Sequence, residues 1–221
     1  MAPQLPRRAF VSGLAVTAAA VSAACRGASP SADMSMAAGA SDDVLAWFNE
    51  PKGVNKAIYD CVNPEGGPSG VLFARNLIKF SHDRLGTSDA DMAVVVSFRH
   101  FSTPFGYTDA MWAKYPQFAA MLKVTDPETK KAATRNWLLH QAVEGQEGST
   151  LPALTEHGAR FAVCGAATAF IAGILAGKTG DAKAIEAELS SNLIPSAKMM
   201  PAGVVGVQRA QRAGYAYTYA G

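Results

Sequence analysis

The stretch DMAVVVSFRH, Asp91 to His100, decides the fold of this chain. Its apolar residues are largely β-branched and occupy successive positions, so a strand formed here is apolar on both faces. Such strands lie in the middle of parallel sheets that helices cover on both sides. The stretch therefore predicts an α/β domain with this strand near the centre of its sheet.

Short apolar runs on either side of this strand predict the rest of the sheet. We expect the other strands at Lys56–Cys61, Arg160–Cys164, Lys198–Pro201 and Tyr215–Tyr219. Because helical stretches separate these runs, the connections are expected to be right-handed crossovers between parallel strands. The sequence thus predicts a three-layer α/β fold with a mostly parallel five-stranded sheet.

Apolar residues at helical spacing predict the helices between these strands. The expected helices are Ser69–Leu85, which Gly86 ends, and then Thr150–His157, Ala166–Ala176, Asp181–Leu189 and Gly203–Arg212. A helical insertion after the second strand, at about residues 101–149, is expected to lie over the sheet. Its helices are predicted at Tyr107–Tyr115, Gln117–Val124 and Pro127–Leu139.

The N-terminus has the pattern of a secretory signal. Arg7 and Arg8 precede an uncharged run of small and apolar residues, Ala9 to Ala24, which is too short and too rich in alanine to predict a membrane span. The arginine pair followed by Phe10 and Val11 resembles the twin-arginine consensus. We predict a twin-arginine signal peptide over residues 1–25 and a periplasmic mature protein; the alternative is an ordinary secretory signal.

Cys25 directly follows the small residues Ser22 to Ala24 and is a candidate for lipidation. The usual lipobox has Leu where this chain has Ser22, so cleavage without lipidation is the favoured hypothesis, and only lipidation would attach the protein to a membrane. Residues 26–42 are rich in Ala, Ser, Gly and Met without periodicity and predict a disordered tether. The folded domain is then expected at residues 43–221, a length that suits one hydrophobic core.

The mature chain is expected to be close to neutral. Lys and Arg together number 20 and Asp and Glu 18, and three of the basic residues, Arg7, Arg8 and Arg26, lie in the N-terminal segment. No cluster of basic residues remains elsewhere, which argues against nucleic acid as a partner. The three cysteines are too few for a disulfide scaffold.

Three predicted strands end in residues that can carry chemistry, namely Cys61, His100 and Cys164. Ligands of open parallel sheets bind at the carboxyl ends of the strands. Cys164 is the strongest candidate, because backbone amides and the dipole of the following helix favour a thiolate there. The alternative is a small buried cysteine without reactivity.

Cys61 is a candidate partner of Cys164. If their strands are neighbours, as the first and third strands are in the flavodoxin-like order, a disulfide is chemically allowed in an oxidising compartment. The favoured hypothesis is that the two side chains point to opposite faces and never meet, because strand register cannot be derived from the sequence.

His100 is a candidate proton shuttle or anion contact beside the thiol, or a structural histidine in an aromatic loop. His82, His140 and His157 show no metal-ligand spacing with each other or with the cysteines, so no metal is predicted. The sequence also lacks a glycine-rich phosphate loop, a G-x-S-x-G elbow and a C-x-x-C motif, and no cofactor is predicted.

The last third of the chain resembles the DsrE-like family of small sulfur-handling proteins. The resemblance rests on GARFAVCGAATAFIAGI (Gly158–Ile174), where a strand ends in cysteine and runs into an apolar helix, and on SNLIPSAKMMPAGVVGVQRAQRAGYAYTYAG (Ser191–Gly221). The second stretch contains a short strand ending near Pro201, a helix opening at Gly203 and a Q-x-x-G-Y ending. Residues 56–100 match the family loosely.

The resemblance implies a flavodoxin-like fold, commonly assembled as trimers or hexamers. In members that relay sulfur, the cysteine corresponding to Cys164 carries a persulfide between partner proteins. This chain departs from those members in its predicted export and in its long insertion, which weakens any transfer of their cytoplasmic partners.

The expected function is therefore that of an exported DsrE-like protein that binds or relays a sulfur or thiol species through Cys164, with His100 nearby and a sulfur-donor or sulfur-acceptor protein as its partner. Two alternatives stay open: a non-catalytic binding or assembly subunit with a buried structural cysteine, and a redox protein that uses Cys61 and Cys164 as a dithiol pair.

Overall fold

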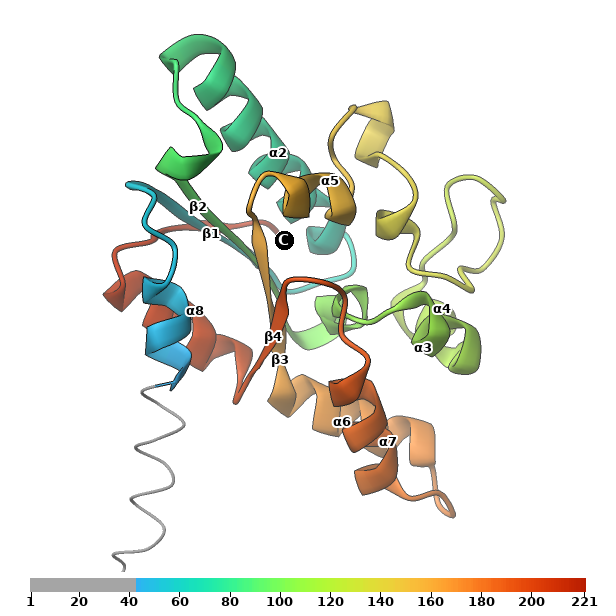
Figure 1. Cartoon of the computed structure of the whole chain (residues 1–221). Helices are drawn as coiled ribbons and strands as arrows, with labels where there is room; N and C mark the ends of the chain where they lie inside the picture. The colour runs from blue at the N-terminus through green and yellow to red at the C-terminus, as the bar shows by residue number, and fades with distance from the viewer. Residues whose placement is uncertain (1–42) are drawn as a thin grey trace, which may run out of the picture.

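A computed structural model describes residues 43–221, with helices on both faces of a parallel sheet (Figure 1). Its five strands are β1 (Asn55–Cys61), β2 (Met92–Phe98), β3 (Arg160–Cys164), β4 (Ala197–Met200) and β5 (Ala216–Tyr219), in the order β4-β3-β2-β1-β5. All four pairings between neighbouring strands are parallel. The predicted flavodoxin-like α/β class is confirmed.

Strand β2 occupies the centre of the sheet, as its sequence predicts. All seven of its residues are buried, and it pairs with β1 on one side and β3 on the other. The strand order differs from the one considered for the cysteines, because β2 lies between β1 and β3. Cys61 and Cys164 therefore end strands that are not neighbours.

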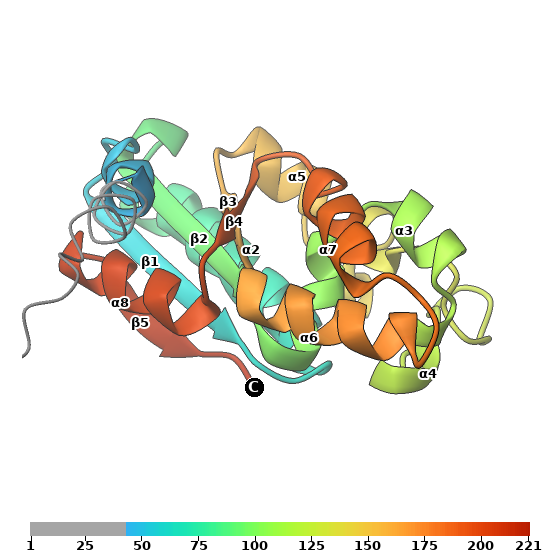
Figure 2. The same ribbon diagram turned by 90° about the horizontal axis from the view of Figure 1, so that it is seen from below.

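The two faces of the sheet are covered by different helices (Figure 2). One face carries α2 (Gly66–Leu85), α5 (Leu151–Glu156), α6 (Gly165–Ala176) and α7 (Ala182–Ser191), whose apolar side chains join one core cluster. The opposite face is covered by α8 (Gly203–Arg212) and by a helix at residues 43–49, which the sequence analysis did not predict.

Side-chain caps explain several helix boundaries. Helix α2 begins three residues before the predicted Ser69, because the Oδ1 atom of Asn63 accepts a hydrogen bond from the N–H of Gly66 at 2.7 Å. The hydroxyl of Thr150 accepts a bond from the N–H of Ala153 and starts α5. Helix α2 ends at Gly86, whose φ of 67° is the left-handed conformation that glycine favours.

The insertion between β2 and α5 consists of short helices and turns. Its helices are η2 (His100–Gly106), α3 (Asp109–Lys114), α4 (Gln117–Leu122), η3 (Trp137–Leu139) and η4 (Val143–Gly145). Several of its aromatic side chains are fully buried in the core cluster shared with α2 and β2, among them Phe105, Trp112 and Phe118. The insertion is thus part of the core on this face.

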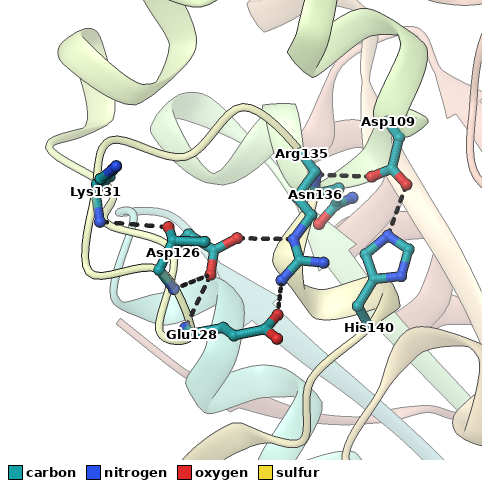
Figure 3. Close-up of polar contacts among 8 residues, drawn as sticks. Asp109, Asp126, Glu128, Lys131, Arg135, Asn136 and His140 are labelled. Atoms are coloured by element: carbon teal, nitrogen blue, oxygen red, sulfur yellow. Dashed lines mark hydrogen bonds and ion pairs between the residues drawn. The ribbon is translucent and has the colours of Figure 1, made fainter.

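The predicted helix at Pro127–Leu139 is wrong. The buried carboxylate of Asp126 accepts hydrogen bonds from the N–H groups of Glu128 and Thr129 and pairs with Arg135 at 2.7 Å (Figure 3). These bonds close a turn, and the segment forms a bridge between Thr125 and Ala132 instead. Local side-chain bonds therefore outcompete the weakly polar helical pattern.

The predicted signal peptide, the tether and Cys25 lie outside the residues that the structure describes. Within residues 43–221, no helix has the length and apolarity needed to cross a membrane.

Candidate functional site

A hollow of about 540 Å³ opens at the carboxyl edge of the sheet. It lies where β2 runs into η2, β3 into α6, and β4 towards α8. The residues that line it are Arg99, His100, Cys164, Ala166, Ala167, Phe170, Ala202, Gly203 and Val204. The strand ends thus bring Cys164 and His100 to one site, as the sequence analysis expected.

Cys164 lies at the junction of two helix N-termini. Its sulfur accepts a hydrogen bond from the N–H of Ala167 at 3.3 Å, which makes Cys164 the N-cap of α6. The sulfur also accepts a bond from the N–H of Gly203 at 3.0 Å, the first residue of α8. Unpaired N–H groups at the start of a helix stabilise negative charge, and two helices supply them here. The thiol group is 6% exposed as part of its residue and lines the hollow.

Arg99 brings a fixed positive charge to the same hollow. Its Nε and Nη2 atoms donate to the two carboxylate oxygens of Asp60 at 2.7 and 2.8 Å. The hydroxyl of Tyr217 on β5 donates to Asp60 at 2.9 Å. Hydrogen bonding to Asp60 raises the pKa of Arg99, so the guanidinium stays charged. Asp60 is 1% exposed, and these two partners compensate its burial.

Gly203 allows α8 to approach the site closely. A Cβ atom at this position would lie 2.4 Å from the Cβ atom of Arg99. Any larger residue would therefore push the start of α8 away from Arg99 and from the sulfur of Cys164.

His100 begins η2 with a φ of 53°, a left-handed conformation that is uncommon outside glycine. Its ring packs against Phe101 with centroids 4.3 Å apart, and the residue lines the hollow. The hydroxyl of Ser102 fixes this turn to the end of β1 by donating to the carbonyl of Cys61 at 2.6 Å. His100 is thereby held at the rim of the site.

Cys61 does not belong to the site. It is fully buried beneath α2 and forms part of the core cluster on the α2 face, whereas the sulfur of Cys164 bonds to α8 on the other face. Burial raises the pKa of the Cys61 thiol, which suppresses its reactivity. Both cysteines are free thiols. The geometry gives no support to a dithiol pair.

Sequence reasoning missed Arg99 and Asp60. Asp60 is a charged residue inside an otherwise apolar strand, a signal that a buried partner compensates it. The alternation of side chains along β1 places Asp60 and Cys61 on opposite faces. Asp60 therefore faces the α8 side with Arg99, while Cys61 faces the α2 side.

A second cluster lies away from this hollow. Of the residues that the structure describes, His82, Asp89 and His157 each offer a metal-ligand atom, and these atoms lie within 4.8 Å of one another. Sequence spacing did not reveal the cluster, because the three residues come from three different elements. His140, the remaining histidine of the earlier comparison, pairs with Asp109 at 2.6 Å instead (Figure 3).

No family model, no curated protein and no solved structure matches this chain.

Proposed function

We propose that this chain is an exported, DsrE-like sulfur carrier in which Cys164 holds the transferred sulfur as a persulfide. The observation that carries the proposal is the double hydrogen bonding of the Cys164 sulfur by Ala167 and Gly203 at a hollow that Arg99 also lines. This environment suits a thiolate and, after loading, an anionic persulfide. The sequence resemblance around Cys164 points to the same chemistry.

The loading step needs no external oxidant. The Cys164 thiolate attacks the outer sulfur of a donor persulfide, R–S–SH; a new S–S bond forms on Cys164, the donor S–S bond breaks, and the donor leaves as the thiolate R–S⁻. The terminal sulfur keeps its proton or gives it up to solvent, and the charge of Arg99 favours the ionised form. His100 is placed at the rim, where it can donate a proton to the departing thiolate.

A partner protein would deliver or accept the sulfur. Phe170 and Val204 line the hollow and expose 57% and 61% of their surfaces, so the approach to Cys164 has an apolar rim that a donor or acceptor protein can cover. Assembly into trimers or hexamers and export to the periplasm are proposed on the sequence alone.

The test is mass spectrometry of the protein purified from the periplasm without reductant, before and after exposure to sodium polysulfide. We expect one added sulfur atom on the peptide that contains Cys164, removable by dithiothreitol. Cys61→Ser should load like the unchanged chain, and Cys164→Ser should not load.

An unmodified Cys164 after polysulfide treatment would overturn the proposal and leave a binding or assembly protein with an inert cysteine. Equal loading of Cys61 would also overturn it, because the environment of Cys164 would then confer no selectivity.

A further inference from the structure

The second cluster joins the ends of three elements on the α2 side of the sheet. His82 lies in the last turn of α2, Asp89 begins η1 (Asp89–Asp91), and His157 caps the end of α5. One carboxylate oxygen, Oδ1 of Asp89, lies 3.5 Å from Nε2 of His82 and 2.9 Å from Nδ1 of His157. The two imidazole rings meet edge to face with centroids 5.9 Å apart.

The local backbone fixes this convergence. Gly86, in its left-handed conformation, turns the chain back after α2, and the N–H of Thr87 bonds to the carbonyl of Ser81. Ser88 then caps η1, with its N–H and its hydroxyl both donating to Oδ2 of Asp91 at 2.8 Å. These bonds hold Asp89 beside His82, so the arrangement does not depend on one mobile side chain.

The bonding within the cluster is incomplete. Nε2 of His82 is buried and has no hydrogen-bond partner, and its only printed neighbour of opposite charge is the Asp89 oxygen at ion-pair distance. A buried polar atom without a partner carries a free-energy cost that a ligand can remove. Two histidines directed at one carboxylate form a donor set that zinc uses in proteins.

The distances fit a metal ion. Bonds of about 2.0–2.1 Å in a tetrahedral zinc site place neighbouring ligand atoms about 3.3 Å apart. The observed separations of 3.5 and 2.9 Å lie on either side of that value, so small rotations of exposed side chains complete the geometry. His82 and His157 also line a hollow of about 360 Å³, through which water or a small ligand can reach the fourth position.

We propose that His82, Asp89 and His157 bind a divalent transition-metal ion, zinc by preference, with the fourth position open to solvent. Imidazole nitrogen with one carboxylate favours zinc over magnesium or calcium, which prefer oxygen ligands throughout. The site is separate from Cys164 and does not rest on its proposed role.

The test is isothermal titration of zinc chloride into the full chain, prepared without a histidine tag and freed of metal with a chelator. We expect one ion per chain and a higher melting temperature with zinc. His157→Gln and Asp89→Asn should each weaken binding by at least about 100-fold, since even an outer-shell partner contributes 10–100-fold. Both residues are about half exposed, so these variants should fold normally, which circular dichroism can verify.

His140→Gln is the matched control, because it removes a histidine that also pairs with an aspartate but has no third ligand nearby. It should bind zinc as the unchanged chain does. Cys164→Ser should likewise retain binding, and the cobalt form should lack a thiolate charge-transfer band. Unchanged affinity in His157→Gln and Asp89→Asn, no binding at all, or loss of binding in Cys164→Ser would each overturn the proposal.

Discussion

Cys61 and Cys164 both end parallel strands of one sheet, yet their surroundings differ in almost every respect. After Cys164 the chain enters α6 at once, and the sulfur takes up hydrogen bonds from two helix N-termini beside a hollow. After Cys61 the chain forms a loop, and α2 then covers the sulfur completely. The comparison teaches that a strand end becomes a site only where the following backbone leaves its amides free and the sheet face leaves space.

The largest expected difference is in reactivity. With iodoacetamide at about pH 6, Cys164 should be alkylated at least about 100-fold faster than Cys61, because burial raises the pKa of the Cys61 thiol and each unit lowers its thiolate fraction tenfold. Peptide mass spectrometry over time measures both rates in one sample. In urea the two rates should converge; similar rates in the folded protein would contradict the comparison.

Two glycines test the two surroundings separately. A Cβ at Gly70 would lie 2.2 Å from the sulfur of Cys61, and a Cβ at Gly203 would lie 2.4 Å from the Cβ of Arg99. Gly70→Ala and Gly203→Ala should each lower the free energy of unfolding by about 1–3 kcal/mol, as overpacking does. Only Gly203→Ala should also slow alkylation of Cys164, because it displaces a donor to the sulfur.

The control for both is Gly173→Ala in α6, where an added Cβ meets no atom within 4 Å. It should raise the free energy of unfolding by about 0.5–1 kcal/mol through helix propensity. Urea denaturation gives all three values. Slower alkylation of Cys164 in Gly70→Ala would show that the two environments are coupled.

The alkaline limb of stability sharpens the comparison further. The Cys61 thiol has its pKa raised above the ordinary value of 9.0 by burial, so its contribution is fully present below pH 9.0 and is lost as the pH rises towards the folded pKa. Above that pH, the free energy of unfolding should fall by about 1.4 kcal/mol per pH unit from this group. Cys61→Ala should remove that part of the slope in urea titrations from pH 8 to about pH 10.5; an identical slope would contradict the burial argument.

The smallest expected difference concerns replacement of each cysteine by serine. Serine is a favourable N-cap, so its hydroxyl can accept the amide bonds at position 164, and Cys164→Ser should cost less than about 1 kcal/mol. Cys61→Ser places a hydroxyl in a fully buried apolar environment and should cost about 1–3 kcal/mol. Urea midpoints decide the order, and a larger loss for Cys164→Ser would reverse our assignment of the two sites.

Local patterns in the sequence predict most of the fold. The apolar run of β2, the break at Gly86 and the passage from β3 into α6 all lie where the pattern places them, because each depends on neighbouring residues. The segment after Asp126 fails for the opposite reason: one carboxylate captures nearby N–H groups and replaces helical bonds.

The site is less predictable, because it depends on strand order and register. Cys164 and His100 follow from the rule that strand ends carry ligands, but the separation of Cys61 required knowing that β2 lies between β1 and β3. The Asp60–Arg99 pair joins two strands and the His82–Asp89–His157 cluster joins three elements, so no spacing along the chain reveals either.

The bond from Tyr217 to Asp60 has a consequence for biosynthesis. Strand β5 is translated after every other strand of the sheet, and until it docks, Asp60 lacks one of its two partners and one side of β1 is unpaired. The ribosome therefore releases a sheet whose charged edge is unfinished, and the site reaches its final form only when the C-terminal strand closes it. If the chain is carried across a membrane in the folded state, docking of β5 is the step that must precede transport.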